Sequence, residues 1–171
     1  MSTTVFNAAY EAGLPIVERT NHALYISHYP LGRDATVNYP DVDLKFSNDT
    51  GHWLLLRTFV GSSSLTVGLY GTPDHRRIES TTAPLRFVAP PPVRKTVDAT
   101  LKPGAVAVDD YGVPAQATSV ERKVYSQAGK LLSDQTWYSS YRAEPKVIRV
   151  GPKRPKKPPV GTADQLPGGP H

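Results

Sequence analysis

Two apolar stretches decide the fold class: WLLLRTFV at residues 53–60 and LTVGLY at residues 65–70. Both contain β-branched and aromatic side chains, which at this length favour strands over helices. The residues between them, GSSS at 61–64, have the composition of a hairpin turn. We therefore predict that residues 53–70 form an antiparallel hairpin at the centre of a sheet.

Upstream of the hairpin, the chain begins with a predicted helix at residues 2–13. Ser2 or Thr3 is a suitable N-cap, and Gly13 followed by Pro15 is a strong signal for the end of a helix. The apolar positions that recur at helical spacing are Val5, Ala8, Ala9 and Ala12. We expect this apolar face to pack on a larger element, because a helix this short is marginal alone.

The remaining sequence predicts short strands joined by turns. The chain has 171 residues and 17 prolines, about twice the usual ~5%, together with 13 glycines. This composition excludes a helical bundle, and we predict an α+β, mainly β fold with one short helix on an antiparallel sheet. Further strands are expected at residues 16–17, 24–26, 42–46, 97–101, 118–125, 131–138 and 146–150.

The chain divides by composition into four parts. Three consecutive prolines at 90–92 predict a stiff linker over residues 90–97. It would join a domain at residues 1–89 to a small elongated β module at residues 98–151. Residues 152–171 contain six prolines and three glycines, so we predict a disordered tail.

Charge and cysteine content exclude several functions. The net charge is +5, but residues 152–171 carry four basic groups and one acidic group, which is +3 and leaves only +2 for the body. Nucleic-acid binders usually carry their basic residues on the fold, so we expect no nucleic-acid partner. The absence of cysteine excludes disulfides, thiolate metal sites and a cysteine nucleophile within this sequence. No stretch reaches the ~18 apolar residues of a membrane span, and no signal peptide is visible.

Several blocks of the first half resemble the VanW-like domain family. They are STTVFNAA at 2–9, VERTNH at 17–22, YPLGRDATV at 29–37, VDLKFSN at 42–48 and LTVGLYGT at 65–72. The resemblance runs from residue 2 to residue 88. Residues 98–151 resemble the G-five surface module, on LKPG at 101–104, a hairpin at 124–132, and residues 138–141 leading into VIRVG at 147–151.

The resemblance implies a role in the bacterial cell envelope. VanW-like domains are associated with glycopeptide-resistance clusters, and members resemble cysteine-dependent L,D-transpeptidases that cross-link peptidoglycan stem peptides. The family pattern places its cysteine in a Cys-Gln-Val-Ser-Thr-Thr arrangement, in which Met1 stands where the valine would be. The nucleophile would then precede Met1 by two positions, so we expect a truncated or late-started domain that is inactive as written. An upstream polypeptide would be the partner that supplies the missing half, and no cofactor is implied.

Within this resemblance, His22 and Asp34 are the expected catalytic side chains. His22 would act as base or imidazolium partner, and Asp34 would orient it. The structural alternatives are a corner histidine bonded to the backbone and an aspartate that caps its own turn.

The expected substrate-binding residues lie beside this pair. Arg33 would clamp a substrate carboxylate. Arg19 is a second substrate-binding candidate, with an ordinary surface pair to Glu18 as its structural alternative. The hydroxyls of Ser2, Thr3 and Thr4 would line the site, with helix capping as the better-supported role.

Aromatic residues in the second half suggest a different function class. Tyr125, Trp137, Tyr138 and Tyr141 would either form a glycan-binding strip or pair across strands in a core. The alternative to the enzyme fragment is therefore a non-catalytic module that binds peptidoglycan or its glycan. The histidines outside the candidate pair have no partners at metal-ligand spacing, so we expect no metal site.

Overall fold

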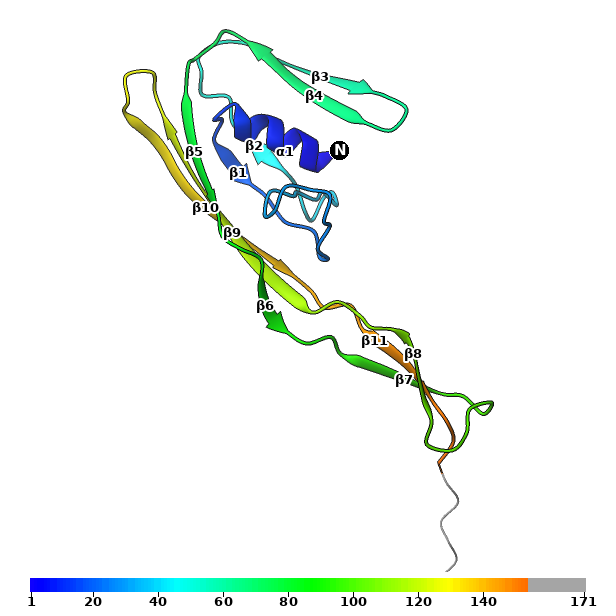
Figure 1. Ribbon diagram of the computed structural model, residues 1–171. Helices are drawn as coiled ribbons and strands as arrows, with labels where there is room; N and C mark the ends of the chain where they lie inside the picture. Colours follow the sequence, from blue (N-terminus) through cyan, green and yellow to red (C-terminus); the bar gives the residue numbers. More distant parts are fainter. Residues whose placement is uncertain (154–171) are drawn as a thin grey trace, which may run out of the picture.

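The computed structural model describes residues 1–153 and shows a mainly β protein with one helix at its start (Figure 1). The helix α1 spans Ser2–Glu11. The fold class predicted from the sequence is confirmed. The predicted disordered tail at residues 152–171 lies almost wholly outside the described residues.

Most strands belong to antiparallel sheets of two to four strands. The strands of the first half are β1 (Ile16–Glu18), β2 (Lys45–Phe46), β3 (Leu54–Val60), β4 (Leu65–Gly71), β5 (Arg77–Thr82) and β6 (Arg86–Ala89). Those of the second half are β7 (Val93–Val97), β8 (Val106–Asp110), β9 (Ala115–Tyr125), β10 (Leu131–Tyr141) and β11 (Lys146–Val150). The sheets are β1-β2, β3-β4, β7-β11-β8, and β9 paired with β10 on one side and with β5 and β6 on the other.

The β9–β10 hairpin is the central structural element of the molecule. Its two strands of 11 residues pair without interruption from Thr136 opposite Glu121 to Tyr141 opposite Gln116. Figure 1 shows α1, β1 and β2 beside the part of this hairpin that pairs with β5. There, Phe6 and Tyr10 of α1 pack with Trp137 of β10 and Val120 of β9 to form the core.

The buried face of α1 differs from the predicted one. Thr3, Phe6, Ala9 and Tyr10 are buried, whereas Val5 and Ala8 are half-buried and Ala12 is exposed. The aromatic side chains bury more apolar surface than the alanines, and they decide which face packs. The N-cap is Met1 and no side chain caps it, so the capping role predicted for Ser2 and Thr3 is wrong. Gly13 follows the helix with a φ of 69°, as the predicted helix end requires.

The end of α1 is fixed by a buried arginine. Arg122 of β9 is fully buried and donates hydrogen bonds to the carbonyl oxygens of Tyr10 and Leu14, both at 3.0 Å. Its guanidinium lies over the adjacent rings of Tyr10 and Trp137, 4.8 and 5.1 Å from their centroids. No carboxylate within residues 1–153 forms an ion pair with it. The partial negative charge of the helix C-terminus takes that place.

The predicted hairpin at residues 53–70 is confirmed as β3 and β4, but its central position in a sheet is wrong. The two strands form a sheet of their own, and Trp53 is 95% exposed. Only Leu54 and Leu69 reach the core. The prediction rested on the continuous apolar run, which is typical of a strand covered on both faces. Within residues 1–153, however, no other strand pairs with this hairpin.

Contacts cross the boundary predicted at residues 90–97. β7 occupies residues 93–97 where a linker was expected, and it pairs in parallel with β11. β9 and β10 belong to the segment predicted to be a separate module, yet both pack on α1, and β9 pairs with β5 and β6. The sequence also predicted strands at 24–26 and 97–101 that are absent from the described structure. It missed β5, β6 and β8, which expose most of their side chains and so lack a clear apolar alternation.

Candidate functional site

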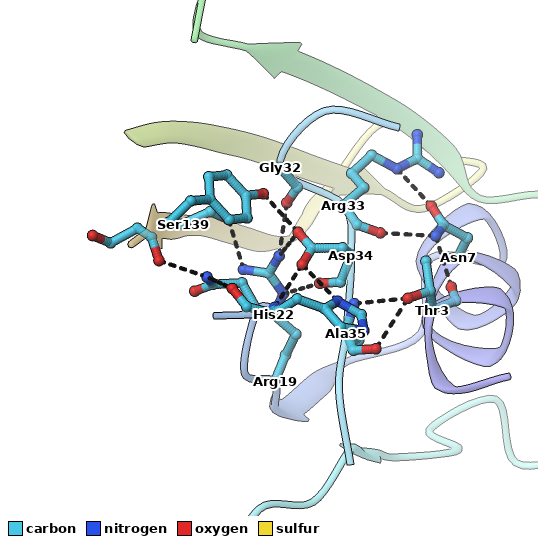
Figure 2. Close-up of polar contacts among 12 residues, drawn as sticks. Thr3, Asn7, Arg19, His22, Gly32, Arg33, Asp34, Ala35 and Ser139 are labelled. Carbon is cyan, nitrogen blue, oxygen red and sulfur yellow. Dashed lines mark hydrogen bonds and ion pairs between the residues drawn. The ribbon is translucent and has the colours of Figure 1, made fainter. Parts of the chain in front are cut away.

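Asp34 lies at the centre of the most densely bonded polar cluster (Figure 2). Its Oδ1 accepts hydrogen bonds from Arg19 Nη2 at 3.0 Å and from the Tyr141 hydroxyl at 2.7 Å. Its Oδ2 accepts from the backbone N–H of His22 at 2.7 Å and lies 2.9 Å from His22 Nδ1. A carboxylate has about four acceptor positions, and here all are used. Asp34 therefore fixes the positions of Arg19, His22 and Tyr141 and does not cap its own turn.

These donors stabilise the ionised form of Asp34. Burial raises its pKa, but the hydrogen bonds from His22 and Tyr141 and the charge of Arg19 outweigh this, so the pKa of Asp34 lies below its usual value. The carboxylate therefore stays charged at neutral pH, and it can accept a hydrogen bond from a protonated ring nitrogen of His22.

His22 is held with one ring nitrogen inward. Because an ionised carboxylate only accepts, the contact with Asp34 places the proton on His22 Nδ1. The other nitrogen, Nε2, is then the acceptor, and the side chain is 24% exposed. The ring of Tyr29 packs against His22 with centroids 5.5 Å apart. This arrangement brings His22 and Asp34 into the expected contact. Their catalytic roles stay a prediction.

Arg19 is part of the site and not a surface residue. Its guanidinium is almost completely buried and also donates to the carbonyl oxygens of Asp34 and Gly32 and to the hydroxyl of Ser139. Burial lowers the pKa of Arg19, although the charge of Asp34 opposes that change. An arginine stays protonated through such a shift, so the pair is a buried ion pair. Glu18, its expected partner, pairs with Lys45 instead.

Tyr141 completes the cluster from strand β10. Burial and its hydrogen bond to Asp34 raise the pKa of Tyr141 to about 12. Its hydroxyl therefore keeps its proton and acts as a permanent donor at neutral pH. Ser139 was not predicted as a functional residue, and Tyr141 was named only for a glycan-binding strip or a cross-strand core pair.

The loop that carries His22 and Asp34 is docked on β10. The N–H of Arg142 donates to the carbonyl of Ala23 at 2.8 Å, and Asn21 donates to the carbonyl of Ser140 at 2.9 Å. Gly32 has a φ of 68°, and a Cβ there would lie 2.7 Å from Val120 Cγ2. Only glycine allows the chain to pass so close to β9 at this point.

Helix α1 begins beside the site. The hydroxyl of Ser2 donates to the carbonyl of Ala35, next to Asp34 in the chain, at 2.7 Å. The hydroxyl of Thr3 donates to the same carbonyl at 3.0 Å (Figure 2). Thr4 makes no side-chain hydrogen bond among the described residues. Substrate binding by Ser2, Thr3 and Thr4 stays a prediction.

Arg33 points away from the His22–Asp34 pair. It donates to Asn7 Oδ1 at 2.9 Å, pairs with Glu11, and lies over the ring of Tyr10 at 4.2 Å. Its guanidinium is thus committed to α1. Its predicted role as a clamp for a substrate carboxylate stays a prediction.

The four aromatic residues of the second half do not share one face. Trp137 and Tyr141 face the core and the site, whereas Tyr138 between them is 79% exposed. Tyr125 packs under the guanidinium of Arg77. Residues on successive positions of a strand point to opposite faces, so these side chains form no continuous strip.

Three of the site residues lie in a segment that is similar to a known protein family. Residues 1–70 match the family model described as VanW like protein. Residues 1–70 are VanW-like. This VanW-like segment contains Arg19, His22 and Asp34, whereas Tyr141 and Ser139 lie outside it.

A curated relative supports the same segment. YoaR of Bacillus subtilis (strain 168), described as an uncharacterized protein, is 38% identical over 72 residues. The aligned region is 42% of this chain and 24% of YoaR, so the chain spans about a quarter of that relative's length.

The structure is similar to G5 domains over roughly half of the chain. The G5 structure of HP0197 covers 45% of this chain and 99% of its own, with 15% identity and a TM-score of 0.26. The G5 domain of an IgA1 protease covers 47% of this chain and 99% of its own, with 15% identity and a TM-score of 0.28.

Two further features are absent from residues 1–153. In this part of the chain no helix has the length and apolar character needed to cross a membrane. No group of three His, Asp or Glu side chains is arranged to hold a metal ion in the same residues.

Proposed function

We propose that the VanW-like segment supplies the histidine–carboxylate part of a cysteine acyl-transfer site that acts on peptidoglycan stem peptides in the bacterial cell envelope. The main support is the contact between His22 Nδ1 and an Asp34 carboxylate whose acceptor positions are all filled. A histidine fixed in this way exchanges protons through Nε2, which is the role of the base in nucleophilic catalysis.

The sulfur nucleophile comes from outside the given sequence, which has no cysteine. The family pattern places it before the Ser-Thr-Thr block, and Ser2 and Thr3 bond to the residue that follows Asp34. A cysteine at that position would lie at the N-terminus of α1, where the helix dipole and the free N–H groups stabilise a thiolate.

The chemistry then needs two proton transfers. The thiolate attacks the amide carbonyl of one stem peptide, and the imidazolium of His22 gives its proton to the departing amine. The amine of a second stem peptide attacks the thioester, His22 Nε2 takes the proton of that amine, and the thiolate leaves.

The test restores the nucleophile and measures its reactivity. A variant carries Cys-Gln in front of residue 1 together with Met1→Val, and the rate of alkylation by iodoacetamide is followed against pH. We expect the thiol to titrate below the ordinary value of about 8.5 and to lose this shift when His22→Ala is added. We also expect a thioester adduct with a peptidoglycan stem peptide, detected by mass spectrometry.

His28→Ala is the matched control, because His28 is an exposed histidine in the same loop. Identical pH profiles for the His22→Ala and His28→Ala versions would contradict the proposed function. Retention of the cysteine-free chain on purified peptidoglycan, unchanged by His22→Ala, would favour a non-catalytic binding module instead.

A further inference from the structure

The carboxylate that holds His22 is itself held from a distant strand. Tyr141 donates its hydroxyl to Asp34 Oδ1 at 2.7 Å, and Ser139 accepts from Arg19 Nη1 at 3.0 Å. Both side chains are buried and lie two positions apart on β10, so they share the face that meets the loop. This strand lies outside residues 1–70, the part that matches the VanW-like family model.

The distribution of donors determines which oxygen His22 can use. Oδ1 takes Arg19 and Tyr141, and Oδ2 takes the N–H and ring of His22. An arginine beside a carboxylate tends to bind both oxygens in a bidentate pair. The Tyr141 hydroxyl fills the remaining position on Oδ1, and Ser139 holds a second guanidinium nitrogen of Arg19 away from Asp34. Together they keep Oδ2 available for His22.

We propose that Tyr141 and Ser139 are positioning residues for the His22–Asp34 pair, so that the site is complete only when β10 is docked on the VanW-like segment. The purpose of this positioning rests on the proposed function, whereas the positioning itself is a property of the four side chains. Neither residue touches substrate in this scheme.

Backbone contacts on both sides of Tyr141 separate docking from orientation. The carbonyl of Ser140 accepts from Asn21, and the N–H of Arg142 donates to Ala23. These bonds hold the loop on β10 without using the tyrosine hydroxyl. That hydroxyl is therefore available to act on Asp34 alone, and its removal is expected to change orientation more than docking.

The test compares Tyr141→Phe with Tyr138→Phe in the full chain. Tyr138 is on the same strand but points to solvent, so it controls for loss of a tyrosine hydroxyl. The ratio of the two neutral tautomers of His22 is read from 15N NMR of the imidazole ring. We expect the ratio of the Nδ1-protonated to the Nε2-protonated tautomer to fall roughly fivefold in Tyr141→Phe, because this is the size of effect that loss of one hydrogen bond produces. The ratio should not change in Tyr138→Phe. Titration of the Asp34 carboxyl by 13C NMR should show its pKa rising in Tyr141→Phe only.

A second pair of variants tests Ser139. Ser139→Ala should shift the His22 tautomer ratio in the same direction, whereas Ser140→Ala, an exposed neighbour, should not. If Tyr141→Phe does not fold, a 3-fluorotyrosine at position 141 strengthens the donor and should raise the Nδ1-protonated share. A lower melting temperature with an unchanged tautomer ratio and Asp34 titration would overturn the positioning role.

The outcome is separable from that of the proposed function. The NMR measurements need no thiol, so they report on positioning whether or not acyl transfer occurs. Normal tautomer shifts with an unreactive added cysteine would contradict the proposed function alone. An unchanged tautomer in a reactive protein would contradict the positioning alone.

Discussion

Asp34 receives donors from two parts of the chain that are far apart in sequence: its own loop, through Arg19 and His22, and strand β10, through Tyr141. Removing a carboxylate from such a cluster leaves Arg19 as a buried charge without its partner. Loss of one partner of a buried ion pair is usually more costly than loss of a surface pair, by several kcal/mol. The residue therefore contributes to stability as well as to the orientation of His22.

Asp34→Asn should make the protein less stable and less sensitive to acid. We expect a loss of about 3 kcal/mol in the free energy of unfolding at neutral pH. The folded-state pKa of Asp34 is lowered, so its stabilisation is complete above the unfolded value of 3.8 and is lost as the pH falls through the folded value. Urea unfolding at several pH values should show this acid slope in the native protein and a shallower slope in the variant.

Asp41→Asn serves as the control, because Asp41 is exposed and forms no ion pair within residues 1–153. It should leave both the stability and its pH dependence unchanged. Equal acid slopes in the native protein and in Asp34→Asn would show that the carboxylate is not held as described.

The sequence predicted part of this cluster, and the reasons for the omissions are physical. His22 and Asp34 were named through the family resemblance, and the structure brings them together. Tyr141 lies 107 residues from Asp34, and no local pattern connects the two. One signal was present on β10, where Gln135 and Ser139 alternate with Trp137 and Tyr141 on a single face. Small polar side chains among buried aromatic ones indicate polar partners on the opposing surface.

At the level of elements, the loop of residues 19–36 depends on one glycine for its close approach to β9. Gly32 has a positive φ, and a methyl group there would meet Val120 and Thr118 at 2.7 and 3.1 Å. Its carbonyl also accepts from Arg19. Any side chain at this position would push the loop away from the strand, and the site lies within that loop.

Gly32→Ala should therefore be much more disruptive than Gly129→Ala. Both glycines have a positive φ, 68° and 81°, but a methyl group at Gly129 would meet no atom within 4 Å. We expect about 1 kcal/mol of destabilisation at Gly129 from backbone strain alone, and about 2–4 kcal/mol at Gly32, where overpacking is added. Thermal unfolding measures both, and equal effects would indicate that the loop does not pack on β9.

Element prediction succeeded where side-chain pattern and pairing agree. The strand at residues 146–150 has the predicted bounds, and those at 118–125 and 131–138 extend by only three residues each as β9 and β10. Prediction failed for β7, which follows a polyproline segment and pairs in parallel with a strand more than fifty residues away. Such long-range pairing leaves no periodic signal in a short exposed strand.

At the scale of the whole molecule, the β3–β4 hairpin exposes a group of large apolar side chains. Trp53, Leu55, Phe59 and Val60 are exposed, and the hairpin forms a two-stranded sheet with unpaired edges. An exposed apolar hairpin of this kind tends to pair with other chains. We therefore expect the isolated chain to be poorly soluble.

Replacing Trp53→Ser and Val60→Thr together should reduce self-association. We expect the native chain to show species larger than the monomer in sedimentation velocity, and the double variant to shift toward the monomer. Tyr39→Ser is the control, because Tyr39 is 82% exposed but lies outside the hairpin. A native chain that sediments as a monomer at all concentrations would contradict this prediction.

Because Arg122 fixes the end of α1, we expect the two ends of this helix to respond differently to low pH. The hydrogen bonds of Arg122 are to backbone carbonyl oxygens and to the side-chain amide of Gln135, none of which titrates, whereas the loop beside the helix start depends on an ionised aspartate. Protonation of Asp34 at low pH should consequently weaken the packing of the loop of residues 19–36, but not the contacts of Arg122 at the end of α1. Hydrogen exchange in acid should show the amides of residues 19–36 losing protection while those near Tyr10 and Leu14 keep theirs. Acid unfolding would then begin at the loop and reach the end of α1 later.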